Sequence, residues 1–300
     1  GIFISGNGVA SLAGPYSASA TLTGGTKVAI DATLLGIYVE KGGAWNGNDP
    51  TGSLTIGAAI SPNDGIKLVN AGSFVSTSSI NVTANHSGIS VGNAERFSLD
   101  GGDQTRSAVN VLGWSASGTY AYETGIDYSD AGIATGLVKN VTINMLDTGA
   151  NGFYGNGYGV NMQQGSLALD HVTINSQNID GAAVTGIGGT LNATALTINA
   201  QGKGTAGIQS ERHSPNSMSF TLGGATTNTV QTNGDADPSS TAFGNYKYAA
   251  GINLLDGTVN VSNTNVITTG TQAYGIYLSQ GRLDAHLFAG PGTGVSIQTS

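Results

Sequence analysis

The chain has 300 residues, only 9% of them charged, and a formal net charge of −8. Its ten Lys and Arg residues form no basic cluster, which argues against a nucleic-acid-binding surface. No apolar run approaches the roughly 18 residues that a membrane-spanning helix needs, and cysteine is absent, so the fold must be stabilised by burial and strand pairing.

A short phrase recurs along the chain: a glycine, a branched aliphatic residue, any residue, and usually another apolar one. Eight copies begin at Gly36, Gly65, Gly88, Gly125, Gly159, Gly207, Gly251 and Gly275. We interpret Gly186-Ile187 as a degenerate ninth copy. Self-similarity of this kind is the signature of solenoid proteins, in which each unit packs only on its neighbours.

Further strand patterns follow each copy in chain order. Apolar and polar residues alternate in segments such as Ser53–Ile56, Val141–Asn144 and Val172–Asn175, which is typical of strands with one buried face. No segment carries an apolar stripe of helical period. The sequence therefore predicts a single all-β domain over residues 1–300: a right-handed, three-stranded parallel β-helix (solenoid) with inserted loops, of about ten to twelve turns.

Two residue types are expected at corners of the coil. Each copy begins with glycine, which suits a corner that needs a backbone conformation other residues resist. Asn144, Asn175 and Asn199 follow the third strand at equivalent points. Because Asn tolerates left-handed backbone angles and stacked amides hydrogen-bond along an axis, we interpret these asparagines as structural.

Gly65 and Gly88 are 23 residues apart, so longer intervals between copies must hold loops. We expect these loops near residues 40–51, 100–131, 147–158, 209–217 and 232–248. Residues 295–297 still follow a strand pattern, so we expect the natural protein to continue beyond Ser300.

The stretch Thr269–Leu278, followed by Gln280–Leu283, resembles the passenger repeats of pertactin-like bacterial autotransporters. Their phrase runs from a small polar turn, through an aromatic-Gly-Ile strand, to a Gly-x-Leu strand. The resemblance implies a type V secreted passenger of a Gram-negative bacterium, displayed at the outer membrane or released. It also implies export through a C-terminal outer-membrane β-barrel that is not part of this sequence, and a role as an adhesin, an aggregation factor or a protease.

Few motifs for catalysis are present. The chain has no Gly-Asp-Ser-Gly and no Gly-Asp-Ser-Leu, and its Gly-x-Ser-x-Gly at Gly88–Gly92 belongs to a copy of the repeated phrase. The neighbours Asp170 and His171 are expected to point to opposite faces of a strand. We predict no enzyme, no catalytic residue, no metal and no cofactor. The acids of the 100–131 segment leave a calcium site open; they are Asp100, Asp103, Glu123, Asp127 and Asp130, near Arg106.

Two surfaces are candidates for binding. Aromatic residues gather in the predicted loops, and Tyr and Trp are enriched at binding hot spots; the candidates are Trp114, Tyr120, Tyr122, Tyr154 and Tyr158, with Trp45 in an earlier loop. The polar strand faces are the second surface; they carry Asn161 and Asn253 on the first strand and Thr142, Thr173 and Thr197 on the third. Such a face can hydrogen-bond to an identical face in trans, and weak contacts add along the rod.

The sequence thus predicts a surface-displayed or secreted adhesin that mediates cell–cell aggregation and biofilm formation, or attachment to host matrix. The expected partner is another copy of the passenger, a host matrix protein or a glycan. Two alternatives stay open: a polysaccharide-active β-helix enzyme (lyase or hydrolase), and an inert stalk that presents another domain.

Overall fold

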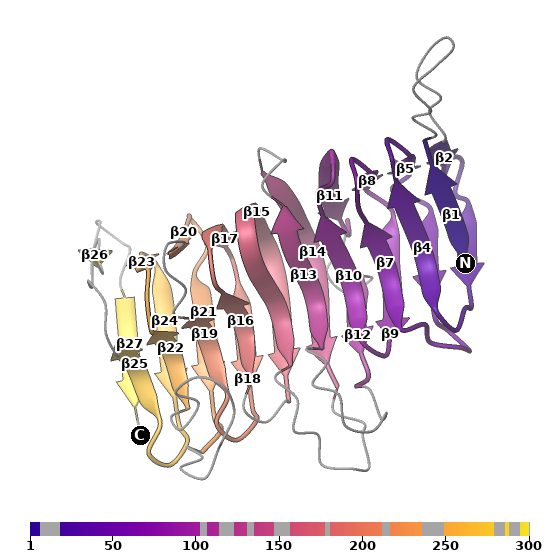
Figure 1. Cartoon of the computed structure of the whole chain (residues 1–300). Coiled ribbons are helices and arrows are strands. Elements are labelled where there is room, and N and C mark those ends of the chain that lie inside the picture. The colour runs from indigo at the N-terminus through magenta and orange to yellow at the C-terminus, as the bar shows by residue number, and fades with distance from the viewer. Residues whose placement is uncertain are drawn as a thin grey trace.

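The computed structural model describes residues 1–6, 19–102, 107–113, 123–130, 135–146, 157–177, 181–211, 217–235, 249–278, 286–287 and 295–299. These residues form strands and turns, and none of them belongs to a helix that could cross a membrane. Each strand pairs in parallel with strands of the neighbouring turns, as between β4 and β7. The chain is an all-β solenoid of parallel strands, as the sequence predicted (Figure 1).

The strand pairings form three series that run along the rod. The first series comprises β1 (Ile2–Ser5), β4 (Leu35–Glu40), β7 (Asp64–Leu68), β10 (Ser87–Gly92), β13 (Thr124–Asp130), the start of β15 (Tyr158–Ser176), β16 (Ala182–Gly186), β19 (Ala206–Ser210), β22 (Ala250–Leu254) and β25 (Tyr274–Leu278). The second comprises β2 (Ser19–Thr21), β5 (Ala44–Gly47), β8 (Ser73–Ser76), β11 (Arg96–Asp100), the start of β14 (Gly136–Met145), the middle of β15, β17 (Gly189–Thr194), β20 (Met218–Gly223), β23 (Thr258–Val261) and β26 (His286–Leu287). The third comprises β3 (Lys27–Ile30), β6 (Ser53–Ile56), β9 (Ser79–Ala84), β12 (Ala108–Val111), the ends of β14 and β15, β18 (Thr197–Ala200), β21 (Asn228–Thr232), β24 (Thr264–Thr268) and β27 (Val295–Thr299).

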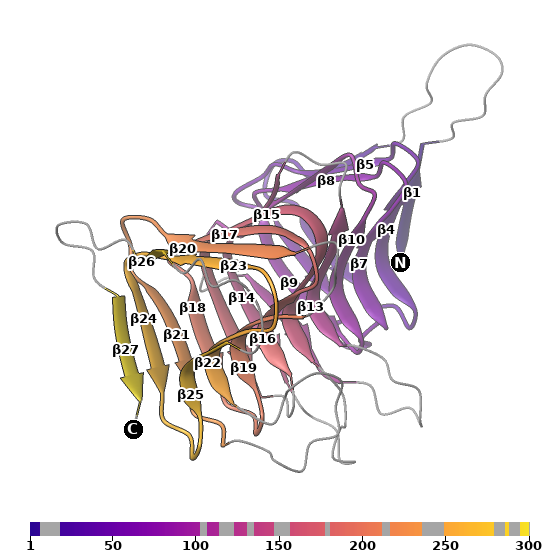
Figure 2. The ribbon, with the colours of Figure 1, turned by 60° about the vertical axis from the view of Figure 1, so that its left-hand side comes forward.

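The turns stack along one axis. Each series has ten strands in the described part of the chain when β14 and β15 are counted in every series they enter. Neighbouring strands of a sheet lie about 4.8 Å apart, so the stack is about 45 Å long. Figure 1 shows the two termini at opposite ends of the stack, and Figure 2 shows the strands wound around a common interior.

The repeated phrase builds one internal column of branched side chains, one per turn. Its members are Ile2, Ile37, Ile66, Ile89, Ile126, Val160, Val184, Ile208, Ile252 and Ile276. From Ile37 to Ile252 these side chains are fully buried. Each such burial contributes roughly 1.5–3 kcal/mol, so this column adds substantially to the stability of the fold.

The proposed ninth copy at Gly186-Ile187 is wrong. Val184 occupies the column instead, and Ala183 stands where the other turns have glycine. Gly186 is the last residue of β16, and Ile187 lies beyond it. The true copy was hidden in the sequence because alanine replaces the glycine that defines the phrase.

The repeat glycines are explained by close packing and not by backbone angle. From Gly36 to Gly251 none of them has a positive φ. A Cβ atom built on Gly207 lies 2.5 Å from Cγ1 of Val230 and 2.6 Å from the carbonyl oxygen of Gly251. Real Cβ atoms do not approach other atoms so closely, so the expectation of a strained corner is wrong. The next turn and the third series together leave room only for hydrogen.

Parts of the predicted loops are strands. Segment 40–51 holds β5, whose Trp45 is 1% exposed and stacks on Phe74 with ring centroids 6.1 Å apart. Trp45 is therefore a core residue, because the alternation of β5 turns it inward in register with Phe74. Strands β12 and β13 lie within segment 100–131, and β19 extends to Ser210 within segment 209–217.

Candidate functional site

The outer side of the third series carries a column of threonines. Thr142 pairs with Thr173, Thr173 with Thr197, and Thr197 with Thr229, on four successive turns. All four side chains are half-buried on the outside of the rod. The predicted outward ladder of Thr142, Thr173 and Thr197 is present, and it extends one turn further.

A ladder of asparagine side chains runs beside the threonines. Nδ2 of Asn144 donates to Oδ1 of Asn110 at 2.8 Å, and Nδ2 of Asn175 to Oδ1 of Asn144 at 2.8 Å. Nδ2 of Asn199 donates to Oδ1 of Asn175 at 2.9 Å. The predicted hydrogen bonding along the axis is confirmed. The predicted corner position is wrong, because these residues lie within strands and none has a positive φ.

The asparagine ladder does not use all of its hydrogen-bonding groups. A side-chain amide has two N–H donors and two acceptor lone pairs. Asn144 and Asn175 each donate one hydrogen bond and accept one within the ladder. Each amide therefore keeps one N–H and one lone pair, and these half-buried groups are available to water or to a partner.

We call the outer side of the third series from β6 to β24 the Thr–Asn face. The strand segments that form it contain no Asp, Glu, Lys or Arg over eight successive turns. The chain as a whole has a net charge of −8. At about 4.8 Å per turn, the uncharged surface is about 34 Å long. The strands of the first and second series, by contrast, carry charged residues such as Asp127 and Lys139.

The outer side of the first series is more mixed. Nδ2 of Asn161 and Nε2 of Gln163 both donate to Oδ1 of Asp127, at 2.9 Å and 3.1 Å. Asn253 was expected to face a partner, but it is 1% exposed, as is its neighbour Gln209. Strand alternation places the Asn253 side chain on the outer side of the sheet, but neighbouring residues cover it and solvent does not reach it. Asn253 is therefore not a surface binding residue. The side-chain amide of Asn161 already donates a hydrogen bond to Asp127.

The aromatic candidates divide into two groups. Tyr158 begins β15 and is 2% exposed. It packs with Ala182 and Ala206, and its hydroxyl donates to Oε1 of Glu211 at 3.3 Å. Tyr158 thus anchors the outside of the sheet and offers no exposed ring. The other four, Trp114, Tyr120, Tyr122 and Tyr154, lie outside the described residues.

Burial and hydrogen bonding shift the pKa values of two groups, Asp127 on β13 and His86 just before β10. Burial raises the pKa of the Asp127 carboxyl, and the bonds from Gln163 and Asn161 oppose that rise. The pKa of the His86 imidazole is raised by its hydrogen bond to Asp64, with Nδ1 and Oδ1 3.1 Å apart. Among the described residues, no group of three or more His, Asp or Glu side chains is arranged to hold a metal ion.

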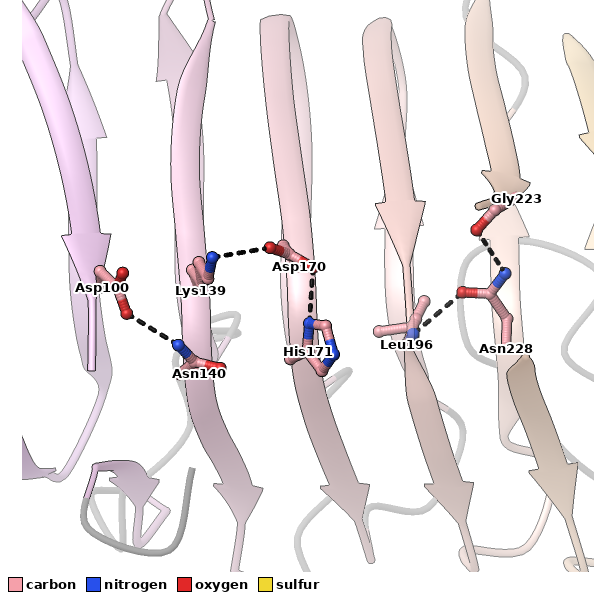
Figure 3. A network of polar contacts seen from close by, with 8 residues as sticks. All are labelled: Asp100, Lys139, Asn140, Asp170, His171, Leu196, Gly223 and Asn228. Carbon is pink, nitrogen blue, oxygen red and sulfur yellow. Dashed lines mark hydrogen bonds and ion pairs between the residues drawn. The ribbon is translucent and has the colours of Figure 1, made fainter. Parts of the chain in front are cut away.

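Two of the acids of segment 100–131, Asp100 and Asp127, lie in different series of the rod. Asp100 lies at the corner between the second and third series, where its Oδ1 accepts from Nδ2 of Asn140 at 2.9 Å (Figure 3). Asp127 lies on β13, in the first series. Asp103 and Arg106 are outside the described residues, as is the side chain of Asp130. Asp100 and Asp127 therefore do not support the calcium site that the sequence left open for this segment.

The same corner joins Asp170 to Lys139 and His171. Nζ of Lys139 lies 3.2 Å from Oδ2 of Asp170, and Nδ1 of His171 lies 2.7 Å from Oδ1 (Figure 3). The expectation that Asp170 and His171 point apart is wrong, because His171 has a left-handed backbone with φ of 54°. One turn further on, Oδ1 of Asn228 accepts from the backbone N of Leu196 at 2.9 Å. Hydrogen bonds and an ion pair at this corner thus connect successive turns of the rod.

A scan against protein-family models, a search of curated proteins and a search of solved structures found no match. Function must therefore be inferred from the surface chemistry of the chain.

Proposed function

We propose that this chain is the passenger of a bacterial autotransporter and acts as an adhesin without enzymatic activity. In this proposal it is a right-handed, three-stranded parallel β-helix, displayed at the outer membrane of a Gram-negative bacterium or secreted. It mediates cell–cell aggregation and biofilm formation, or attachment to host matrix. The observation that carries the proposal is the Thr–Asn face, which is long, polar and uncharged.

Electrostatics favour this face as the contact surface. Two copies of a chain with a net charge of −8 repel each other over most of their surfaces. The Thr–Asn face avoids that cost, because no charge lies on it over eight turns. A single contact between half-buried hydroxyl and amide groups is weak, since water competes for the same bonds. Repetition along a rod adds such contacts into a stable attachment.

The proposal can be tested by placing charges on the face of the displayed passenger. The variant Thr142→Lys, Thr173→Lys, Thr197→Lys sets three like charges in register on successive turns. A matched control, Asn192→Lys, Thr221→Lys, Asn260→Lys, sets three lysines in register on the outer side of the second series. We expect settling of bacteria, or their binding to matrix-coated plates, to be lost in the first variant and kept in the control.

Each outcome of this comparison is informative. Loss of settling alone identifies cell–cell aggregation, and loss of plate binding alone identifies host attachment. Equal behaviour of both variants and the parent contradicts the role of the face. That result favours a stalk whose activity resides elsewhere.

A glycan-active enzyme is the second candidate, and Asp127 is the observation that favours it. Burial raises the pKa of its carboxyl, as in many general acids, and the Asp64–His86 pair is close enough to influence its charge. The test is release of new reducing or unsaturated ends from polysaccharides, with Asp127→Asn as the comparison. Turnover that disappears in Asp127→Asn would establish the enzyme, and no turnover on any polysaccharide leaves the adhesin.

A further inference from the structure

We infer that the Thr–Asn face binds the same face of a second copy in several registers that differ by whole turns. The inference rests on the proposed function, and it specifies the partner and the form of the contact. It makes the strength of adhesion depend on how many turns of the two rods overlap, and not on one unique fit.

The first argument is the identity of successive turns. The threonine column repeats at Thr142, Thr173, Thr197 and Thr229 without interruption. The asparagine ladder repeats beside it at Asn110, Asn144, Asn175 and Asn199. A displacement of one turn, about 4.8 Å, brings threonine onto threonine and asparagine onto asparagine. Register is weakly specified wherever a strand surface presents the same polar pattern at every step.

The second argument is the chemistry left over in the ladder. Asn144 and Asn175 each keep one N–H and one lone pair after their contacts along the axis. Every turn of the ladder thus offers both a donor and an acceptor to a facing amide. The threonines beside the ladder have small side chains, which allow two such faces to approach closely and interdigitate. Stacked Asn ladders and tightly interdigitated side chains form the dry contacts between paired sheets in cross-β assemblies.

The third argument is the absence of a charge pattern. Proteins that pair in one register commonly enforce it with opposite charges across the contact, or with a buried polar residue that must find its equal. The strand segments of the Thr–Asn face carry no charge over eight turns, so no displaced register suffers repulsion. Sliding by one turn removes one turn of overlap and leaves the rest of the contact equivalent.

The pattern itself limits the sliding. Gln231 follows Asn199 in the ladder, and Ile267 follows Gln231. The apolar Ile267 side chain on β24 cannot continue the amide contacts. At the other end, Ala108 of β12 stands in the threonine position. The turns that carry both threonine and asparagine are those of β14, β15 and β18, and the degenerate registers are those that overlap them.

Disulfide trapping tests the inference, because the chain has no cysteine of its own. Thr142→Cys, Thr173→Cys and Thr197→Cys each place one thiol on the threonine column. The variants are mixed in pairs, oxidised mildly, and the cross-linked peptides are quantified by mass spectrometry. Asn192→Cys, on the exposed outer side of β17, is the matched control. Urea unfolding of each variant confirms that the fold is retained.

We expect all like and unlike pairs of the three face variants to cross-link, with yields within about tenfold of one another, equivalent to 1.4 kcal/mol. The control is expected to form none. A fixed register restricts the products: parallel rods join only like positions, while one antiparallel register joins Thr173→Cys to itself and Thr142→Cys to Thr197→Cys, or a similar single set. Either restricted pattern overturns the inference.

The failure of the inference and that of the proposed function are separable. Absence of any cross-link from a protein that sediments as a monomer, while bacteria displaying it still attach to matrix, rejects the second copy as partner and leaves the adhesin. If bacteria that display the lysine variant of the face still settle and still attach, the adhesin role of the face itself is rejected.

Discussion

The side chain of Asn175 donates a hydrogen bond from Nδ2 to Oδ1 of Asn144 at 2.8 Å, across 31 residues of sequence. The contact exists because Cα atoms of the two residues are direct partners in neighbouring turns. One column of side chains therefore serves two purposes. It connects successive turns along the axis, and it presents amide groups at a regular spacing on the outside.

Replacing Asn175 by alanine should destabilise the rod by about 1–2 kcal/mol, because two hydrogen bonds of the ladder are lost, to Asn144 and Asn199. Urea unfolding measures the change. The control is Asn192→Ala, on an exposed position of β17, which should stay within about 0.5 kcal/mol of the parent. Equal losses in the two variants would show that the ladder adds nothing to stability.

Gly88→Ala should destabilise the fold by about 1–3 kcal/mol or more, the usual range for overpacking a core. Its Cβ would lie 2.6 Å from the carbonyl oxygen of Gly125 and against Cγ1 of Val109. Gly92→Ala, on the same strand, is the control, since the nearest atom to its Cβ is 4.0 Å away. The thermal midpoint of unfolding distinguishes them. A mild Gly88→Ala would mean that the turns can separate locally to admit a methyl group.

Asp127→Asn should stabilise the protein at pH 7 and have little effect at pH 3. Burial raises the pKa of this carboxyl, so the folded state favours the neutral form, and stability is lost as pH rises through the folded pKa. Asparagine is neutral and its Oδ1 can still accept from Asn161 and Gln163. Urea midpoints at the two pH values measure the effect. Destabilisation at pH 7 would contradict this account and point to a cation held by the carboxylate.

Asp170→Asn should behave in the opposite way. Burial acts to raise the pKa of Asp170, but the contacts from His171 and Lys139 outweigh it, and the net pKa is lowered. Stability from this group is present above its unfolded pKa of about 3.9 and is lost as pH falls through the folded pKa. The variant should therefore be less stable than the parent at pH 7 and equal to it in strong acid. A loss that persists in strong acid would assign the effect to packing.

His86 should titrate above the ordinary histidine pKa of about 6.5, mainly because its ring is hydrogen-bonded to Asp64. The stability gained from this pair is complete below pH 6.5 and is lost as pH rises through the folded pKa. NMR titration of the ring measures the pKa. It should fall in Asp64→Asn and stay unchanged in Asp170→Asn, which lies in another series. An unchanged value in Asp64→Asn would remove Asp64 as the cause.

Ala71→Gly should stabilise the protein by about 1 kcal/mol, because Ala71 is exposed and has a left-handed backbone that costs an L-residue roughly this much; its φ is 63°. Ala58 is also exposed, and its φ is not positive. Ala58→Gly should therefore lose about 0.4–1 kcal/mol through the added freedom of the unfolded chain. Denaturant midpoints of the two variants should move in opposite directions.

The stacking of turns could be predicted from the sequence because it depends on local period. A glycine-aliphatic phrase recurs with the turn, and this places Ile37, Ile66 and Ile89 in one column. The threonine ladder follows from the same logic, since alternation fixes which side of a strand each residue occupies. Such features require no knowledge of what lies elsewhere in the chain.

What could not be predicted depends on contacts between turns. Alternation gives the side of the sheet on which Asn253 lies, but not its exposure of 1%. Strand β5 has only four residues and turn-forming residues on both sides, so the sequence pattern around Trp45 favours a loop. His171 follows Asp170 in the pattern of a strand, yet its left-handed φ turns the ring back to that carboxylate.

The internal column of branched side chains also affects how such a chain can evolve. Ile66 meets much the same environment from Ile37 on one side as from Ile89 on the other. Tandem duplication of the gene segment that encodes one winding would therefore create a junction resembling those already present. Lineages could then lengthen or shorten the molecule without inventing a new core.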